Sequence, residues 1–275
     1  MIESISHKAL ALLAVLLLAS SPAWSQTVRG DFNMDGDINI SDAVTLINYL
    51  LNDSFGEMPP ESRDTITVNG VSFVMVHVDG GVYSRGMFSE GTEVGSFSIG
   101  QTEVTQELWQ AVMGSLPVVL SIEPKQPMDY TSAVMCEEFI DALNALTGMQ
   151  FRLPTEIEWQ YAACGGTRTL GGIYAGSNDI DQVAWYKSNA PGSSQLRSMP
   201  VAGKAPNELG LYDMSGNVSE WCADCVWTDP KPYYRALRGG NVQSAAVNCQ
   251  VMKTATEVPV DGAAKQVLAG FRLAL

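Results

Sequence analysis

The sequence predicts an irregular, loop-rich α+β protein with a small calcium-binding element of EF-hand type at its N-terminus. Strand-like alternation is confined to residues 68–78 and 82–87, and helical periodicity is clearest at 105–113 and 131–146. Residues 165–240 are instead rich in Gly, Pro, Asn and Ser, with little periodicity. Few regular elements joined by many tight loops therefore indicate an irregular α+β main domain.

Length and composition fit one large domain and a small one. The 275 residues are 46% hydrophobic and include six Trp and nine Tyr, which is enough for a sizeable core. Thirty acidic residues against 16 basic ones give a net charge of −14. Binding to a phosphate backbone needs clustered Lys and Arg, so nucleic acid is not expected as a partner. An acidic surface fits cation binding and solubility instead.

Residues 1–25 have the pattern of a secretory signal peptide. Lys8 precedes an apolar run at 9–19 that is too short to span a bilayer, and small residues from Ala23 to Ser25 suit cleavage near Ser25. An uncleaved anchor is the alternative. No later segment is apolar for long enough to span a membrane, so we expect a periplasmic or secreted bacterial protein.

A calcium-binding loop is predicted within residues 26–53. Its oxygen-bearing side chains occupy the ligand positions of an EF-hand loop, and Gly36 makes the sharp turn at the sixth position. The expected ligands are Asp31, Asn33, Asp35, Asp37, Asn39 and Asp42. EF-hands usually end on Glu, and the shorter Asp42 resembles the dockerin repeat of bacterial polysaccharide-degrading systems. An acidic loop without metal is the alternative.

The helix expected after this loop, at residues 43–51, is apolar on a wide face that must pack on something. Dockerins generally have two such repeats and this sequence shows one, so an adhesion surface would require dimerisation or packing on the main domain. Residues 54–66 have the composition of a linker, stiffened by Pro59 and Pro60. The main domain is expected over 67–275.

The main domain is expected to open with the two strands at 68–78 and 82–87, joined by a turn at Asp79-Gly80-Gly81. In the first strand, one face carries Val71, Phe73, Met75 and His77, and the other Val74, Val76 and Val78. Both faces of this strand therefore carry side chains that can pack.

Three helices are expected after these strands. Thr105 caps the helix at 105–113, and the longest helix, at 131–146, ends near Gly148. The third, at 154–163, begins with a proline, which suits the first turn of a helix.

The residue inventory argues against several catalytic sites. His7 lies in the signal peptide, so His77 is the one histidine left for a triad, and its strand position favours a structural role. The five cysteines are Cys136, Cys164, Cys222, Cys225 and Cys249, and export would favour at least one disulfide. Cys222 and Cys225 have the spacing of a redox motif or half a zinc site, but without further ligands a structural role is favoured.

Residues 209–222 form the most informative stretch of the chain. Asp213 and Glu220 place hard oxygen ligands on either side of a Ser215-Gly216-Asn217 turn, among apolar and aromatic neighbours. Buried carboxylates need a partner, and a cation is the simplest one. A polar loop with solvated acids is the alternative.

This stretch and four further blocks resemble the formylglycine-generating enzyme, or sulfatase-modifying factor, family. In chain order the blocks lie at 97–105, 151–161, 209–221, 237–240 and 270–274. They span roughly the whole main domain. The resemblance implies a variant of the C-type-lectin fold, whereas activity has to be argued from the site itself.

The resemblance also implies a calcium site in the central loop. Asp213 and Glu220 would contribute side chains, and Gly216 and Val218 backbone carbonyls. A second site would lie near Asn189 and Ala190 in the resembled family.

In the resembled enzymes, two cysteines after the Arg-Gly-Gly motif hold a copper ion that activates oxygen. The corresponding residues are Ser244 and Cys249. A serine hydroxyl cannot replace a thiolate as a soft ligand for copper(I), so copper is not expected. Cys249 could be a disulfide partner, a free buried thiol or a remnant.

The favoured function is a secreted, calcium-stabilised, non-catalytic module that binds an unknown protein or glycan. The divergent segment 241–269 is the natural place for a variable binding surface. One alternative is a formylglycine-generating oxidase acting on sulfatase cysteines with one cysteine. The other is a dockerin-bearing component of a glycan-degrading system.

Overall fold

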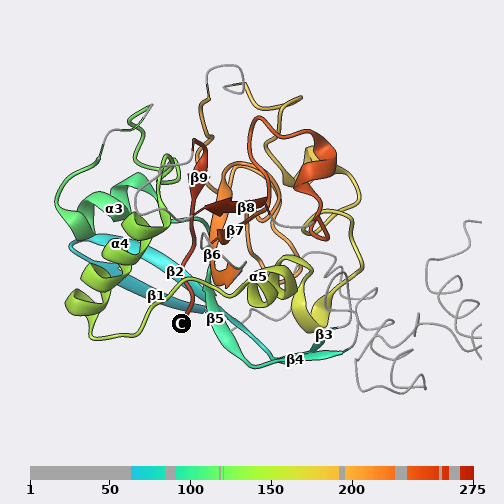
Figure 1. The fold of residues 1–275 in the computed structure, drawn as a ribbon, viewed down its shortest axis with the longest axis horizontal. Coiled ribbons are helices and arrows are strands. Elements are labelled where there is room, and N and C mark those ends of the chain that lie inside the picture. The colour runs from blue at the N-terminus through green and yellow to red at the C-terminus, as the bar shows by residue number, and fades with distance from the viewer. Residues whose placement is uncertain are drawn as a thin grey trace, which may run out of the picture. The chain divides into compact units, whose positions relative to one another are not determined.

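The computed structural model describes residues 63–83, 91–117, 119, 121–191, 196–226, 234–253, 256–259 and 267–275 (Figure 1). The chain divides into two units, Met1–Pro60 and Glu61–Leu275, and all described residues belong to the second. The predicted signal peptide and the predicted calcium loop with its helix lie outside the described residues. Within the described ranges, every helix is too short or too polar to cross a membrane.

The first sheet has three antiparallel strands in the order β1-β2-β5. They are β1 (Arg63–Val68), β2 (Val71–Val78) and β5 (Phe97–Gly100). Asn69 and Gly70 join β1 to β2, with φ of 49° and 85°. Two successive left-handed residues are typical of the tight turns that match the twist of a hairpin.

The main domain begins earlier in the chain than predicted. The predicted linker covers 54–66 and the predicted main domain begins at 67, but β1 starts at Arg63 and pairs in register with β2. Its polar side chains at Arg63, Asp64 and Thr65 are exposed, as on an edge strand, so its composition gave no sign of burial.

A second, smaller sheet pairs β3 (Gly81–Tyr83) with β4 (Thr92–Val94) in antiparallel register. The turn predicted at residues 79–81 therefore does lead into a strand. The rest of the predicted strand, residues 84–87, lies outside the described part of the chain.

The three predicted helices are present. They are α3 (Gln106–Met113), α4 (Ala133–Thr147) and α5 (Glu156–Ala163). Thr105, Ser132 and Thr155 cap them, each accepting a backbone N–H three residues on. Pro154 precedes the cap of α5 instead of starting the helix, and Glu158 completes a capping box with Thr155.

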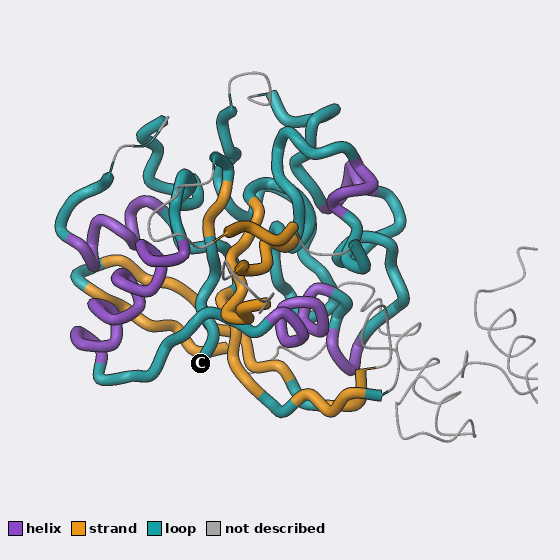
Figure 2. The backbone as a smooth tube through the Cα atoms, viewed as in Figure 1, coloured by secondary structure: helices purple, strands orange, loops and turns teal. Residues whose placement is uncertain are grey.

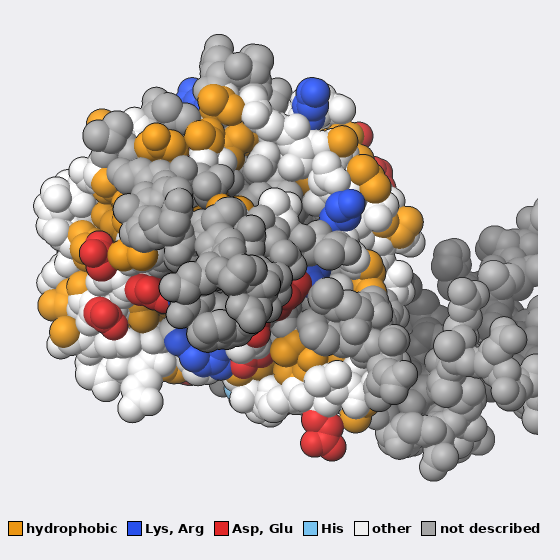
Figure 3. Space-filling view, in the orientation of Figure 1, with side chains coloured by type: hydrophobic (Ala, Val, Ile, Leu, Met, Phe, Trp, Pro, Cys, Tyr) orange, Lys and Arg blue, Asp and Glu red, His pale blue; other side chains and the backbone are white. Residues whose placement is uncertain are grey.

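Helices α3 and α4 lie together beside the β1–β2 hairpin (Figure 1). The outer face of α4 carries Glu137, Glu138 and Asp141, all exposed, and acidic side chains gather over this helix in the space-filling view (Figure 3). This face accounts for part of the acidic surface that the net charge predicted.

The predicted elements do not include the four-stranded sheet, which has the order β8-β7-β6-β9. Its strands are β6 (Ser219–Val226), β7 (Tyr234–Arg238), β8 (Thr256–Pro259) and β9 (Ala269–Gly270). The pair β6–β9 is parallel, and the others are antiparallel. Long loops lead into this sheet from α5 (Figure 2).

The four-stranded sheet lies between two apolar clusters. Trp221 and Leu237 pack in the cluster that contains α3 and α4, whereas their chain neighbours Cys222 and Ala236 pack in the cluster around Trp159. Successive side chains of a strand point to opposite faces, so both faces of β6 and β7 are buried. The start of β6 is therefore held in the middle of the domain.

Candidate functional site

The loop before β6 is held in a tight conformation. Gly216 has φ of +84°, and a Cβ there would lie 2.3 Å from the Trp185 carbonyl oxygen, so this position requires glycine. Asp213 and Asn217 also have positive φ, of 59° and 55°. The Asn217 N–H donates to the Trp185 carbonyl at 2.8 Å. This backbone turns the polar side chains of the loop inward.

Glu220, the second residue of β6, forms a fully buried ion pair with Arg272, just after β9. The Arg272 Nε and Nη2 donate to the two carboxylate oxygens at 2.6 Å each. The Trp159 indole donates to Glu220 Oε2 at 2.7 Å. Side-chain exposure is 1% for Glu220 and 0% for Arg272. The cationic partner that the buried carboxylate needs is therefore a guanidinium of this chain.

Two further carboxylates are buried beside this pair. Glu103 Oε1 accepts from the Asn217 amide at 3.1 Å, and Asp213 Oδ2 accepts from the Ala202 N–H at 2.7 Å. The other oxygen of each carboxylate, Glu103 Oε2 and Asp213 Oδ1, is buried without a hydrogen-bond partner among the described residues. Glu103, Asp213 and Glu220 thus share one guanidinium.

Burial dominates the electrostatics of this acidic centre, defined as Glu103, Asp213, Glu220 and Arg272. Burial, with a smaller contribution from the charge of Glu220, raises the pKa of Asp213 from 3.8 to about 6, although the Ala202 N–H and Arg272 act in the opposite direction. Burial also raises the pKa of Glu103 well above its ordinary value, with Asp213 and Glu220 adding to the shift. Burial opposes the charge of Arg272, but the attraction of Glu220 outweighs it and raises the Arg272 pKa. The centre favours binding of protons or of a second cation.

The two carboxylates predicted to bind calcium differ in how many of their oxygens are free. Asp213 keeps one oxygen without a partner, whereas both oxygens of Glu220 already accept from Arg272. No three His, Cys, Asp or Glu side chains of the described ranges form a metal-binding group. A calcium ion in this loop would therefore need backbone carbonyls, such as the predicted ones of Gly216 and Val218.

The predicted second calcium position is a turn. The Asn189 amide donates to Asp181 Oδ1 at 3.1 Å and to the Ala184 carbonyl at 2.9 Å, and its oxygen accepts from the Tyr186 N–H. Ala190 is buried. The Asn189 side chain thus ties the segment after helix α6 (Ile180–Val183) together.

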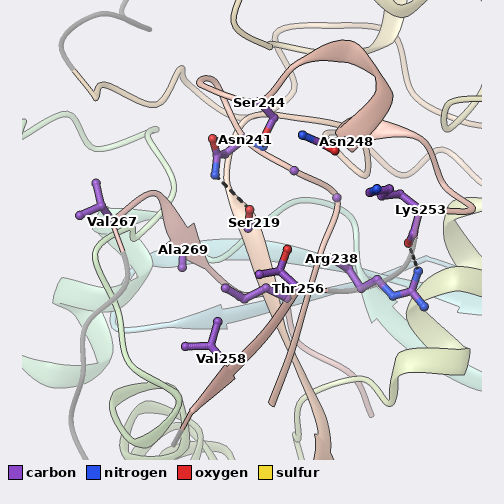
Figure 4. Close-up of a pocket in the computed structure, with 13 residues that line it drawn as sticks. Ser219, Arg238, Asn241, Ser244, Asn248, Lys253, Thr256, Val258, Val267 and Ala269 are labelled. Atoms are coloured by element: carbon purple, nitrogen blue, oxygen red, sulfur yellow. Dashed lines mark hydrogen bonds between the residues drawn. The ribbon is translucent and has the colours of Figure 1, made fainter. Parts of the chain in front are cut away.

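A pocket of about 300 Å³ opens beside the turn that joins β7 to the segment 239–244 (Figure 4). Its 13 lining residues come from the four-stranded sheet, this turn, Asn248 and Lys253, and Val267 just before β9. Ser244, at the first predicted copper position, lies in its wall. The Ser244 hydroxyl accepts the Asn241 N–H at 3.0 Å, so it closes the turn.

Cys249, at the second predicted copper position, does not line the pocket. It ends the short 3₁₀ helix η4 (Ala246–Cys249) and packs against Tyr174 and Val183, with 0% exposure. Burial raises the pKa of its thiol to about 12, so the thiolate is a very minor form at neutral pH. Cys249 is therefore a free buried thiol and not a disulfide partner.

The predicted disulfide is not found at three of the cysteines. Cys136, Cys222 and Cys249 are buried, free thiols packed in the apolar clusters. Cys164 lies near Tyr83 and Met252, with 3.9 Å between the two sulfur atoms. Cys136, Cys222 and Cys249 therefore serve as small apolar side chains in the core and form no cross-link.

Several residues have chemical roles that are not predicted from the sequence. Glu103, Trp159 and Arg272 all lie in the blocks quoted for the resemblance, and an acid or arginine inside an apolar block is a signal of buried pairing. The pocket residues Asn248 and Lys253 lie in the divergent segment and carried no sequence signal. His77 lies on β2, half exposed and 3.4 Å from Asp79, outside both sites.

Comparison with known proteins identifies two family matches. Residues 54–275 match the family described as the sulfatase-modifying factor enzyme 1-like domain. Residues 29–70 match the dockerin type I domain. The first match contains both the acidic centre and the pocket.

Individual proteins match the chain over different lengths. The chaperone protein LppX of Paenibacillus barcinonensis is 30% identical over 234 residues, covering 66% of this chain and 82% of that protein. A formylglycine-generating enzyme of Streptomyces coelicolor is 36% identical, but covers 30% of this chain and 28% of the enzyme. The structure of Treponema denticola variable protein 1 superposes with a TM-score of 0.65 and 28% identity, covering 78% of this chain and 98% of that one.

Proposed function

The chain belongs to the sulfatase-modifying factor enzyme 1-like family, and we propose that it is a non-catalytic member that binds a ligand or assists assembly. The observation that carries this proposal is the state of the two copper positions. Ser244 offers a hydroxyl where the enzymes have a thiolate, and Cys249 is buried with its proton held. Together they supply no thiolate pair for copper(I).

The name of one matched protein supports a role in assembly. The relative that matches over most of its length is named a chaperone protein, and the superposed structure is named a variable protein. The match to the formylglycine-generating enzyme spans 28% of that enzyme. A role in assembly thus agrees with the name of the chaperone relative, which matches over most of its length.

A titration with copper(I) tests the proposal. Competition against a chromophoric copper(I) chelator should show no site on the wild-type protein, and a Cys249→Ser variant should behave identically. A stoichiometric site that disappears in Cys249→Ser would contradict the proposal and favour the alternative, an oxidase that works with one cysteine.

Calcium is proposed in both units. In the core loop, the unpartnered oxygen of Asp213 and that of Glu103 are the available carboxylate ligands, joined by the carbonyls of Gly216 and Val218. A bound calcium ion would offset their charge and hold together a loop with little regular hydrogen bonding. Glu220 contributes through Arg272 and shapes the loop, because both its oxygens are engaged.

In the N-terminal unit, the dockerin match supports calcium at the predicted loop from Asp31 to Asp42. Dockerin domains are typical of extracellular assemblies, so we also propose that this protein is exported. A dockerin-bearing component of a glycan-degrading system stays the second candidate, which the match at residues 29–70 favours.

A further inference from the structure

We propose that the pocket beside the Arg238-Gly239-Gly240 turn binds an acidic sugar, a single ring that carries a carboxylate or a sulfate. This assignment rests on the proposed non-catalytic function, since the pocket contains Ser244, one of the two positions at which the resembled enzymes hold copper. The volume of this pocket, about 300 Å³, is at the lower end of the range for small-molecule sites. It suits a single sugar ring better than an oligosaccharide.

The charge of the pocket differs from that of the whole chain. None of its lining residues is acidic, although the chain has 30 acidic residues against 16 basic ones. Arg238 and Lys253 both line it. The pocket is therefore a local exception to a negative surface, which favours an anionic ligand.

Lys253 supplies the available cation. The Arg238 guanidinium is buried and engaged by Glu156, which balances its charge. No described carboxylate pairs with the Lys253 ammonium, and this side chain is exposed. The Arg238 Nη1 donates to the Lys253 carbonyl at 2.6 Å, and the Lys253 N–H donates to the Gln250 carbonyl at 3.0 Å. These bonds fix the backbone from which the ammonium reaches the pocket (Figure 4).

The polar wall offers further hydrogen-bonding groups. The Asn248 amide and the Thr256 hydroxyl line the pocket and bond to none of the described residues. Asn241 and Ser219, by contrast, bond to each other at 3.1 Å, which holds this part of the lining in place. The amide of Asn248 and the hydroxyl of Thr256 suit the hydroxyl groups of a sugar, because each can donate and accept.

The opposite wall is apolar. Val258, Val267 and Ala269 lie across the pocket from Asn248 and Lys253 (Figure 4). A sugar ring has one apolar face of C–H groups and a rim of hydroxyls, so it fits between such walls. An inorganic anion would use the ammonium alone and leave the apolar wall unused.

The test uses the full-length protein without copper, at low ionic strength. The probes are D-glucuronate and D-galactose 6-sulfate, with D-glucose and D-galactose as neutral counterparts and inorganic sulfate as the bare anion. Dissociation constants come from ligand-observed NMR titration. We expect at least one acidic sugar to bind at least about tenfold more tightly than its neutral counterpart and than inorganic sulfate.

Variants locate the site. Lys253→Gln should weaken binding of the acidic sugar about tenfold and remove its salt dependence, whereas Lys125→Gln, which removes an exposed lysine elsewhere, should change it less than about twofold. Asn248→Ala should weaken binding of both the acidic and the neutral sugar. Circular dichroism confirms that each variant is folded.

Three results would overturn the assignment: no saturable binding of either acidic sugar, equal binding of the neutral sugars or inorganic sulfate, or equal effects of Lys253→Gln and Lys125→Gln. None of these results bears on copper binding, so the proposal of a non-catalytic protein would stand or fall separately.

Discussion

Glu220 and Arg272 form a two-hydrogen-bond ion pair, with both bonds 2.6 Å long and both side chains closed to solvent. The pair joins the start of β6 to the residues after β9, and Arg272 also donates to the carbonyls of Gly100 and Tyr212. One arginine thus connects the residues after β9 to the end of β5, to the central loop and to the start of β6.

Glu220→Gln should destabilise the domain by about 3–5 kcal/mol, because it removes the charged carboxylate that accepts two hydrogen bonds from the buried Arg272. The matched control is Glu107→Gln, which breaks the exposed pair with Lys125 and should cost less than about 1 kcal/mol. Urea unfolding followed by Trp fluorescence measures both. Equal effects of the two variants would show that the buried pair is not structural.

Calcium should raise the melting temperature of the main domain through the core loop. Binding at a hundredfold excess over Kd contributes about 2.7 kcal/mol to the wild type. Asp213→Asn and Glu103→Gln should lose most of this increase, since each removes a carboxylate whose second oxygen has no partner. Scanning calorimetry with calcium and with chelator gives the difference. An unchanged calcium effect in both variants would contradict the assignment.

Stability without calcium should depend on pH through Asp213. Its folded pKa of about 6 exceeds the ordinary 3.8, so the folded state binds the proton more tightly. Ionising the buried Asp213 carboxylate lowers the free energy of unfolding. This loss is absent well below pH 3.8, grows as the pH rises and reaches its full size above pH 6. Lowering the pH from 7 to 5 in chelator should stabilise the wild type relative to Asp213→Asn by roughly 1 kcal/mol. A constant difference, or one of opposite sign, would refute this.

The thiols should be protected and unpaired in the native protein. Cys136, Cys222 and Cys249 are buried, and burial raises the thiol pKa of each, which suppresses the reactive thiolate. Alkylation of the native protein should leave these three unmodified, and alkylation in guanidinium should modify all three. A disulfide to any of them, seen by peptide mass spectrometry, would be the contrary result.

Local patterns in the sequence were enough to predict the three longer helices and strand β2. Helices α3 and α4 have long apolar periodicity and a Thr or Ser cap, so their residues specify them without help from distant contacts. Strand β1 was missed because its exposed side chains are polar. The four-stranded sheet was missed because it forms from short segments separated by Gly- and Asn-rich loops.

The site was predicted in part. The central loop was recognised from Asp213 and Glu220, and both are buried as expected. Arg272 was not recognised as the partner of Glu220, because it lies 52 positions away and only the fold brings the two side chains together. Lys253 and Asn248 face the pocket from a segment without motif, so tertiary structure alone identified them.

The central claim is that this family member does not convert a sulfatase cysteine to formylglycine. The direct measurement is mass spectrometry of a Cys-x-Pro-x-Arg peptide incubated with oxygen and the copper-treated protein, with an active formylglycine-generating enzyme as the positive control. We predict no loss of mass from the peptide cysteine with the wild type, and little activity for Ser244→Cys, because Cys249 stays buried outside the pocket. Formylglycine formation by the wild type that is abolished in Cys249→Ser would contradict the account.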